Sequence, residues 1–253
     1  QGMQLPPISQ DEIDARIAGH LDELLALWHA EQGEEKARDL ELIAAVLPLA
    51  GEQPLRILDL CCGPGDVGRA VQRRFPNAHV DGVDRDPFLT SICRGVNARS
   101  GAKGKTFVRD LEDTHWHSPL SPPYDAVVVA NALHWFTPKR VVEIATDVLR
   151  LLRAGGAFIV VEPTRPDTPF RAGFDGWTAT QPPRYRRENW ERFWSRANHL
   201  LGYDHIELLG SRSDRIDEGA VADWIALLRG AGFASPDVLW RDAEEVMLGA
   251  IKP

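Results

Sequence analysis

Residues 57–68 contain the most informative grouping of chemical functions in the chain. They read ILDLCCGPGDVG, in which a short apolar strand carries Asp59 and a turn with Gly63 and Gly65 leads into a predicted helix. Glycines let the main chain pass close to a ligand, and a helix N-terminus presents unpaired N–H groups and partial positive charge to a carboxylate or phosphate. This arrangement predicts a site for an adenosine-containing cofactor.

Two residues near the turn bear on the identity of that cofactor. The glycines of GPGDVG, with Asp84 about twenty residues further on, match the G-x-G-x-x-G fingerprint of dinucleotide sites. However, Asp59 lies on the strand just before the turn, and Pro64 separates the first two glycines. Asp59 would repel a pyrophosphate, but it would attract a cofactor with an ammonium and a sulfonium group. S-adenosylmethionine carries both cations.

The segment resembles the first motif of the class I S-adenosylmethionine-dependent methyltransferases, which usually reads hydrophobic-Asp-Leu-Gly-Cys-Gly-x-Gly. Cys61 stands in the place of the first glycine, while the strand acid and the two turn glycines are present. The resemblance covers roughly residues 34–162 and 218–252. It implies that S-adenosylmethionine, which becomes S-adenosylhomocysteine, is held at this turn by Asp59, Cys61, Gly63 and Gly65.

Two further acids end predicted strands. Asp84 ends the second strand, where a carboxylate can accept hydrogen bonds from both hydroxyls of a ribose. The alternative role is to cap the next helix, for which Asp86 is better placed. Asp110 ends the third strand, and the resemblance implies that it faces the adenine amino group; a solvated strand-end acid is the alternative. Arg85 and Leu111 complete this part of the predicted donor site.

The segment NALHWF, residues 131–136, follows the fourth predicted strand at the point where methyl donor and acceptor would meet. The resemblance implies that the backbone of Asn131 and Ala132 lies beside the methionine part of the donor, and that His134 and Trp135 face the acceptor. Because imidazole titrates near about 6.5, His134 is the candidate catalytic base. The alternative is a hydrogen-bonded histidine that orders the loop.

Residues 163–217 break the strand-helix rhythm and are predicted to be an insert that forms part of the acceptor pocket. The insert mixes arginines with aromatic side chains, which can bind an acidic or aromatic ligand by ion pairing and stacking. The candidate acceptor contacts in it are Trp177, Tyr185 and His205. The alternative is a helix over 187–201 with its arginines in solvent. Its inward face would consist of Trp190, Phe193, Trp194 and Ala197.

The elements that would position these groups alternate along the chain. Helices are predicted over 9–28 and 34–47, and the alternation that begins at Leu55 indicates a parallel sheet. Strands are predicted over 55–60, 79–84, 106–110, 124–132 and 157–163, with helices over 66–75, 87–98 and 137–153 and a turn at 155–156. After a helix over 220–229, the extended segments 238–242 and 244–252 are close enough to favour an antiparallel hairpin.

The predicted fold class is therefore α/β. We expect a Rossmann-like, doubly wound, mainly parallel seven-stranded sheet with an antiparallel C-terminal hairpin, N-terminal helices and the insert after strand 5. Residues 1–50 are predicted to form an N-terminal helical cap and residues 51–253 the methyltransferase domain.

Composition limits the possible partners. The net charge of −8 and the pI near 5.5 argue against a nucleic-acid surface. The three cysteines make no disulfide framework, and His115 and His117 would point to opposite sides of an extended chain, so no metal site is predicted. No apolar run reaches the roughly eighteen residues of a membrane span. We expect a cytoplasmic monomer or homodimer that acts on a small-molecule acceptor.

The function that the residues favour is S-adenosylmethionine-dependent methyl transfer to a small organic acceptor by direct in-line displacement. One alternative is an RNA-base methyltransferase, which the insert's arginines and aromatic residues would suit. Another is a non-catalytic S-adenosylmethionine-binding protein. A third is an NAD-dependent oxidoreductase, which has the glycine spacing in its favour and Asp59 and the terminal hairpin against it.

Overall fold

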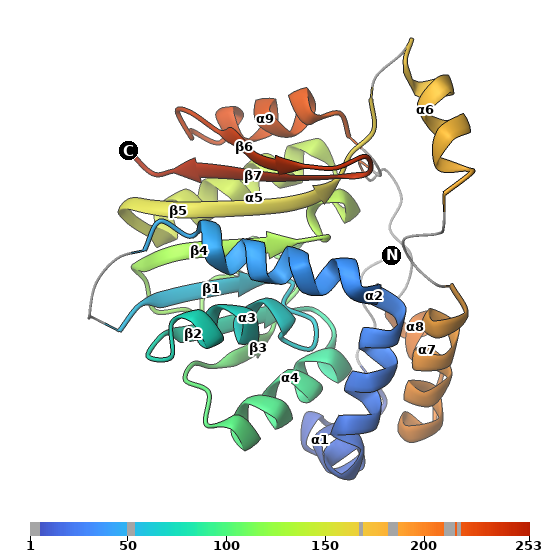
Figure 1. Ribbon diagram of the computed structural model, residues 1–253. Coiled ribbons are helices and arrows are strands. Elements are labelled where there is room, and N and C mark those ends of the chain that lie inside the picture. Colours follow the sequence, from blue (N-terminus) through green and yellow to red (C-terminus); the bar gives the residue numbers. More distant parts are fainter. Residues whose placement is uncertain (1–5, 50–53, 167–168, 182–186, 210–215, 217–218) are drawn as a thin grey trace.

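A seven-stranded sheet forms the centre of the molecule (Figure 1). The computed structural model describes residues 6–49, 54–166, 169–181, 187–209, 216 and 219–253. In these residues the strand order is β3-β2-β1-β4-β5-β7-β6. The strands are β1 (Arg56–Leu60), β2 (His79–Asp84), β3 (Thr106–Val108), β4 (Tyr124–Ala130), β5 (Leu152–Pro163), β6 (Asp237–Arg241) and β7 (Glu245–Ile251).

The strand directions confirm the predicted fold class. Strands β1 to β5 run parallel, whereas β7 lies antiparallel between β5 and β6. Parallel strands end at one edge of a sheet, so the residues that follow β1, β2, β3, β4 and β5 share that edge. The candidate site is built there.

Helices cover both faces of the sheet. They are α1 (Gln10–Ile17), α2 (Leu21–Val46), α3 (Asp66–Arg74), α4 (Pro87–Ser100), α5 (Pro138–Leu151), α6 (Arg171–Thr178), α7 (Arg187–Leu201), α8 (His205–Leu209) and α9 (Val221–Gly230). Helices α5 and α9 pack on one face, and α3 with the second half of α2 packs on the other (Figure 1). Strand β4 is buried on both sides because Val127 and Val129 face α5 while Val128 faces α3.

A third apolar cluster joins the insert to the N-terminal helices. It unites α1, the first half of α2, α4 and α7. Phe193 and Trp194 of α7 are buried in it as predicted, but Trp190 is 39% exposed, so its predicted inward packing is wrong. Arg196 of α7 donates from Nε to Glu23 Oε1 of α2 at 2.8 Å, so this arginine is paired with a carboxylate on α2.

The N-terminal helices divide at a different place from the one predicted. Ser9 caps α1 by accepting a hydrogen bond from the Glu12 N–H, as its place in the sequence indicates. A 3-10 turn at Ala18–His20 then interrupts the helix predicted over 9–28. Helix α2 continues through 29–33, where the sequence pattern favours a break. The cost of Gly33 within a helix is only about 1 kcal/mol, which the packing of a long helix can offset.

A second correction concerns residues 155–156, for which the sequence predicts a turn before the fifth strand. They lie within β5, which already pairs with β4 at Leu152. Gly155 has φ +70°, its N–H donates to the Lys252 carbonyl at 3.0 Å, and the register between β4 and β5 shifts nearby. Glycine therefore serves a bulge here, because a bulge needs a conformation that other residues adopt at a cost.

Candidate active site

The loop between β1 and α3 turns sharply at three residues. Cys61, Gly63 and Gly65 have φ values of +53°, +51° and +89°. This left-handed region suits glycine, and Cys61 adopts it although it carries a side chain. A Cβ on Gly63 would meet only Trp28, at 3.8 Å, whereas a Cβ on Gly65 would lie 2.6 Å from Cys93 Sγ. Gly63 leaves room for a ligand, and Gly65 leaves room for the protein's own packing.

Asp59 lies beneath this loop and is 2% exposed. Its Oδ2 accepts a hydrogen bond from the Gly68 N–H of α3 at 3.2 Å. Burial, with the nearby negative charges of Cys93, Asp84 and Asp66, raises the pKa of Asp59 well above its ordinary value. A cation placed next to Asp59 would relieve this unfavourable situation. The buried carboxyl group of Asp59 therefore suits the ammonium group of an amino-acid-containing ligand and not a pyrophosphate.

Asp84 ends β2 and accepts a hydrogen bond at each carboxylate oxygen. Oδ2 accepts from the Gly63 N–H at 2.9 Å, and Oδ1 accepts from the Asp86 N–H at 2.8 Å. Burial and the negative charge of Asp86 raise the pKa of Asp84 to about 6. The cap of α4 is Asp86, whose Oδ1 accepts from the N–H groups of the helix's first turn. Asp84 is thus fixed to the glycine loop rather than committed to a helix.

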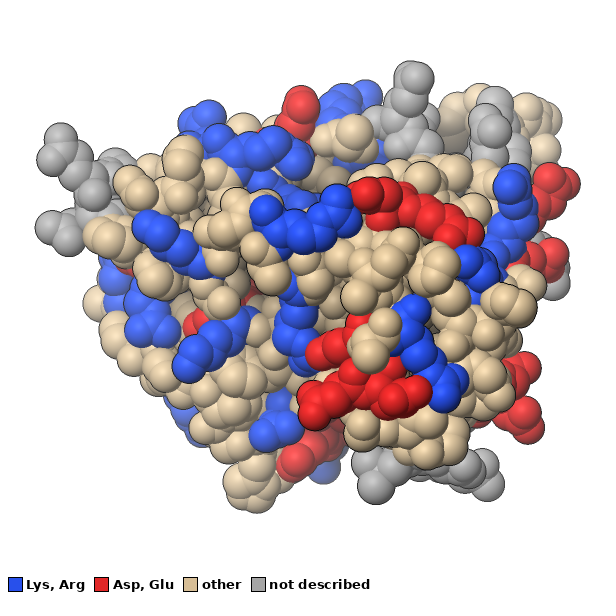
Figure 2. Space-filling view, turned by 90° about the horizontal axis from the view of Figure 1, so that it is seen from below, with Lys and Arg blue, Asp and Glu red and all other residues tan. Residues whose placement is uncertain are grey.

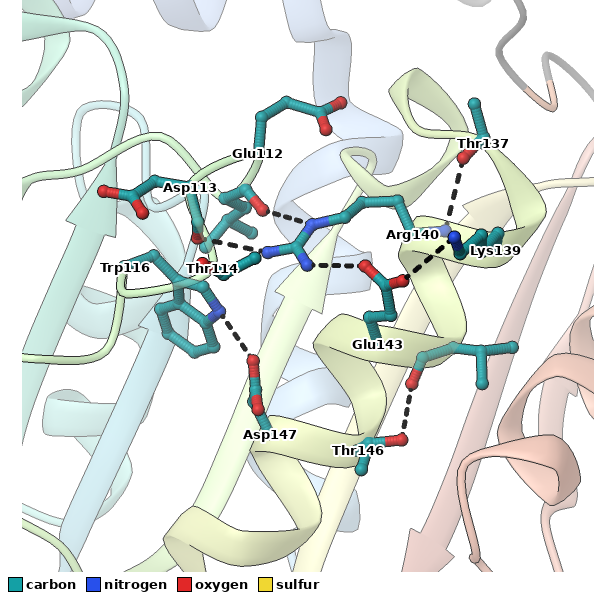
Figure 3. A network of polar contacts seen from close by, with 12 residues as sticks. Glu112, Asp113, Thr114, Trp116, Thr137, Lys139, Arg140, Glu143, Thr146 and Asp147 are labelled. Atoms are coloured by element: carbon teal, nitrogen blue, oxygen red, sulfur yellow. Dashed lines mark hydrogen bonds and ion pairs between the residues drawn. The ribbon is translucent and has the colours of Figure 1, made fainter.

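The segment after β3 is held in place by a buried arginine (Figure 3). Arg140 of α5 is 7% exposed; its Nε donates to the Leu111 carbonyl at 2.7 Å and its Nη2 to the Asp113 carbonyl at 3.1 Å. Asp110 Oδ1 accepts from the Glu112 N–H at 3.0 Å. Arg140 therefore fixes the backbone around the predicted adenine-binding residues. No sequence motif marks Arg140, since an arginine on an amphipathic helix ordinarily lies in solvent.

Glu162 organises the loop after β4. It is fully buried at the end of β5, and its Oε1 accepts hydrogen bonds from the N–H groups of Ala132 and Leu133 at 3.1 and 2.6 Å. Its Oε2 lies 2.8 Å from His134 Nδ1 and also accepts from the His134 N–H at 3.3 Å. Because a carboxylate only accepts, Nδ1 carries the proton that faces Glu162. Nε2 is then the basic nitrogen of the neutral ring.

The remaining contacts of this loop come from the neighbouring strands. Asn131 has φ +55°, and its N–H donates to the Val161 carbonyl at 2.7 Å. Its side-chain Nδ2 donates to Glu245 Oε1 of β7 at 2.9 Å. The antiparallel hairpin thus contributes a carboxylate that holds the predicted donor-acceptor loop. A charged residue that ends an apolar strand, such as Glu162, is the signal by which the sequence could have indicated this arrangement.

Helix α2 lies over the glycine loop. The Trp28 indole N–H donates to Asp66 Oδ2 at 2.8 Å, and His29 Nε2 lies 2.8 Å from Asp66 Oδ1. Burial alone would raise the pKa of Asp66, but the bond from His29 and the charge of Arg69 lower it to about 2. Asp66 begins α3, so its negative charge also suits the helix dipole. These contacts join an N-terminal helix to the first turn of the predicted donor site.

The structure places the predicted acceptor contacts in different surroundings. Trp135 is 44% exposed and its ring centroid lies 5.2 Å from that of His134. Trp177, on α6, is 51% exposed, and Figure 1 shows α6 projecting away from the sheet. His205 is fully buried and bonds to Asp86. Tyr185 lies outside the described residues.

The described residues also bear on two other kinds of site. Among them, no group of three or more His, Cys, Asp or Glu side chains has an arrangement that could hold a metal ion. Within the same residues, none of the helices combines the length and the apolar character needed to cross a membrane.

The comparisons with known proteins agree with this geometry. Residues 57–156 match a family described as a methyltransferase domain. Residues 57–156 thus have the sequence of a methyltransferase domain, which agrees with the resemblance of the chain to the class I S-adenosylmethionine-dependent methyltransferases. The matched residues run from β1 into β5 and so include the glycine loop and the loop after β4 that Glu162 holds.

Two relatives of this methyltransferase domain are called trans-aconitate 2-methyltransferase. The one from Rhodopseudomonas palustris (strain BisB18) is 32% identical over 149 residues, which are 57% of this chain and 54% of the relative. The one from Streptomyces avermitilis is 28% identical over 107 residues, which are 42% of this chain and 39% of the relative. The chain thus spans about half the length, or less, of these curated relatives.

Solved structures show the same fold at low sequence identity. An O-methyltransferase family protein from Burkholderia thailandensis has a TM-score of 0.56 at 17% identity, covering 85% of this chain and 55% of that protein. Human N-acetylserotonin methyltransferase, solved in complex with S-adenosylmethionine, has a TM-score of 0.54 at 13% identity, covering 97% of this chain and 60% of that protein. At these identities the likeness concerns the fold alone.

Proposed function

We propose that this protein transfers a methyl group from S-adenosylmethionine to a small organic acceptor. The observation that carries the proposal is Asp59, a buried carboxyl group beneath a glycine loop. Burial and neighbouring acids raise its pKa, and a cationic partner would favour its ionised form. A ligand ammonium would supply that cation. The match of residues 57–156 to a methyltransferase domain supports the same assignment.

The donor would be held by residues from several strand ends. Asp59, Cys61, Gly63 and Gly65 would bind its amino-acid part, and Asp84 with the neighbouring Arg85 would bind its ribose. Asp110 and Leu111 would bind the adenine, and the backbone of Asn131 and Ala132 would lie beside the methionine portion. When bound, S-adenosylmethionine supplies a methyl group on a sulfonium. The chain's own task is then to position an acceptor and exclude water, and positioning can be worth about 7–11 kcal/mol.

A small carboxylic acid is the acceptor class to test first. Support comes from the relatives named trans-aconitate 2-methyltransferase, because aconitate is a small polycarboxylate. A carboxylate oxygen is already deprotonated near neutral pH, so this acceptor would need no base. His134, oriented by Glu162, would then orient the acceptor; with a hydroxyl or amine acceptor its Nε2 could also take up a proton.

We assign the acceptor side to Trp135 and to the insert, with residues 1–50 as a helical cap and residues 51–253 as the methyltransferase domain. The contacts of Trp28 and His29 with Asp66 support a role for the cap over the donor loop. The exposure of the Trp135 and Trp177 rings supports their place on the acceptor side.

The first experiment is thermal unfolding of the protein with S-adenosylhomocysteine, S-adenosylmethionine or NAD. A ligand at a hundred times its dissociation constant adds about 2.7 kcal/mol to the free energy of unfolding. We expect both adenosyl compounds to raise Tm and NAD to leave it unchanged. A shift with NAD alone would overturn the proposed donor.

A second experiment tests the acceptor. Transfer of the labelled methyl group from S-adenosylmethionine is followed with trans-aconitate, with a monocarboxylate, with a phenol and with RNA as separate acceptors. Methyl transfer to trans-aconitate supports the carboxylate class. Transfer to RNA alone would establish the alternative function, and binding of the donor with no transfer to any of the four would favour a protein that only binds it.

A further inference from the structure

One histidine of the insert reaches the donor side of the molecule. His205 lies at the start of α8 and is fully buried. Its Nε2 is 2.7 Å from Asp86 Oδ1, the same oxygen that accepts hydrogen bonds from the N–H groups of Phe88 and Leu89. Since the carboxylate is an acceptor, His205 Nε2 carries the proton in this contact.

Asp86 connects this histidine to the predicted ribose-binding acid. The Asp86 N–H donates to Asp84 Oδ1 at 2.8 Å, and Asp84 Oδ2 accepts from the Gly63 N–H at 2.9 Å. A continuous series of three short polar contacts therefore runs from His205 through Asp86 and Asp84 to the glycine loop. Helix α7 packs against α2, and α8 packs against α7 (Figure 1).

The surroundings of His205 fix its ring. It stacks on Trp194 with a centroid distance of 5.8 Å and an interplanar angle of 20°. It also packs against Phe88 and Tyr203, at 5.7 and 5.9 Å. The buried atoms Asp86 Oδ2, His205 Nδ1, Trp194 Nε1 and Tyr203 Oη have no hydrogen-bond partner among the described residues. Oδ1 of Asp86 thus accepts three hydrogen bonds and Oδ2 accepts none. The position of the Asp86 side chain is therefore sensitive to the loss of one hydrogen-bond donor.

We propose that His205 is a positioning residue for the donor site, acting through Asp86 on Asp84. This inference rests on the proposed function. It adds that the insert, besides facing the acceptor, also controls the affinity of the protein for S-adenosylmethionine. Without the Nε2 donor, Asp86 would retain only the backbone donors of α4. The first turn of α4 would shift, and the Asp86 N–H that holds Asp84 Oδ1 would shift with it.

Two substitutions separate the hydrogen bond from the packing. In His205→Phe an aromatic ring still stacks on Trp194 but cannot donate to Asp86. In His205→Gln the stacking is lost, but the amide nitrogen can donate. We expect His205→Phe to weaken S-adenosylhomocysteine binding at least tenfold and to raise KM for the donor while kcat at saturating donor stays within twofold. We expect His205→Gln to stay within about threefold of wild type in donor affinity. His199→Ala, an exposed histidine of the same insert, is the matched control.

The readouts are calorimetric binding of S-adenosylhomocysteine and thermal unfolding of each variant. A His205→Phe protein that binds S-adenosylhomocysteine as tightly as wild type would overturn the inference. It would also be overturned if His205→Phe and His205→Gln lost affinity equally and in proportion to their decrease in Tm. If wild-type protein does not bind S-adenosylhomocysteine, the proposed function fails instead.

A double-mutant cycle covers the case in which His205→Phe does not fold. Asp86→Asn keeps a residue that caps helices well but removes the charge. We expect the effects of Asp86→Asn and His205→Ala on S-adenosylhomocysteine affinity to be non-additive, because His205→Ala removes the Nε2 donor and the two residues act through one contact. Additive effects would contradict the inference.

Discussion

The buried carboxyl group of Asp59 destabilises the free protein and is proposed to bind a ligand cation. Its carboxylate is buried beside other negative groups, and the raised pKa reflects how poorly the protein alone stabilises the charge. A buried charge without a partner is costly, and a ligand cation removes the cost only when it binds. Asp59 thus favours the ligand-bound protein over the free one.

Replacing Asp59 with Asn tests this balance. We expect Asp59→Asn to weaken S-adenosylhomocysteine binding at least tenfold, which is about 1.4 kcal/mol or more. The free variant should unfold at the same temperature as wild type or at a higher one, because the buried charge is gone. Calorimetry and thermal unfolding give both values; a lower Tm with unchanged affinity would contradict the expectation.

Asp84 should make donor binding depend on pH. Its pKa in the folded protein is raised to about 6 from an ordinary value of 3.8, so it contributes stability below about pH 4 and loses that contribution as pH rises through 6. Ribose hydroxyls bond more strongly to the ionised carboxylate. The affinity for S-adenosylhomocysteine should therefore fall as pH drops below 6. Titrations at pH 5, 6, 7 and 8 measure it.

The control for this pH dependence is Asp84→Asn, which should bind more weakly and show a shallower profile. The profile should not become flat, since the raised pKa of Asp59 acts in the same direction. A wild-type affinity that is constant from pH 5 to 8 would show that neither acid titrates on binding.

His134 distinguishes acceptor classes. If the acceptor is a carboxylate, no proton is removed. We then expect His134→Ala to lower kcat about tenfold or less and to leave the shape of the pH–rate profile unchanged. If the acceptor is a hydroxyl, the loss should be about 10²–10⁴-fold, and the dependence of the rate on a deprotonated base should disappear. Steady-state rates across pH with each acceptor decide between these results, and near-normal turnover with every acceptor would remove His134 from the catalytic residues.

At the scale of elements, the turn that begins α3 limits what the donor loop tolerates. Gly65 has φ +89°, and a Cβ there would lie 2.6 Å from Cys93 Sγ on α4. The turn therefore has two separate reasons for glycine: its backbone conformation and the approach of another helix. Gly101, at the end of α4, has φ +69°, and a Cβ added there would meet no atom within 4 Å, so it has the first reason alone.

This pair of glycines yields a prediction about stability. Gly101→Ala should cost about 1–2 kcal/mol from the left-handed backbone. Gly65→Ala should cost more and should also weaken donor binding, because either Cys93 or the loop must move. Urea unfolding of both variants measures the difference, and Cys93→Ala in the Gly65→Ala background should recover part of it. Equal costs for the two glycines would refute the steric explanation.

Sequence pattern predicts the elements of the sheet better than their ends. Period and composition locate the five parallel strands and the terminal hairpin, since buried strands and glycine turns are local signals. The break at Ala18–His20 and the continuity of α2 through 29–33 depend on packing between distant helices, which local propensity does not report. Gly155 and Gly156 resemble a turn because a bulge uses the same residues.

The candidate site divides in the same way. The strand acids Asp59 and Asp84 can be predicted because a charge at the end of an apolar strand is conspicuous. Arg140 and Trp28 cannot, since their contacts with Leu111 and Asp66 join segments that lie far apart in the sequence. His205 is predicted as an acceptor contact, and its bond to Asp86 gives it a position that no spacing rule would indicate.

At the scale of the whole molecule, the insert and the N-terminal helices form one apolar cluster with α4. Two of the insert's arginines, Arg165 and Arg196, pair with Asp175 and Glu23. On the face shown in Figure 2, Lys and Arg side chains are scattered over the left and upper parts, and Asp and Glu side chains gather at the lower centre. Basic and acidic side chains thus both occur on this face.

The charge distribution leads to a prediction about RNA. With a net charge of −8, and with Arg165 and Arg196 of the insert already paired with carboxylates, the protein should show no salt-sensitive affinity for single-stranded RNA. Filter binding at about 50 and 200 mM salt would measure this. Micromolar binding that weakens steeply with salt would revive the RNA-base alternative.

The contact between Trp28 and the first turn of α3 has an optical consequence. The indole N–H bonds to Asp66, and the ring lies against the space above Gly63. A ligand that enters this space changes the polarity and hydrogen bonding around a fluorescent ring. Trp28 is one of eight tryptophans, so the difference in emission between the wild type and Trp28→Phe isolates its signal. The protein thus carries its own fluorophore at the donor loop, and stopped-flow emission could time donor entry without a label.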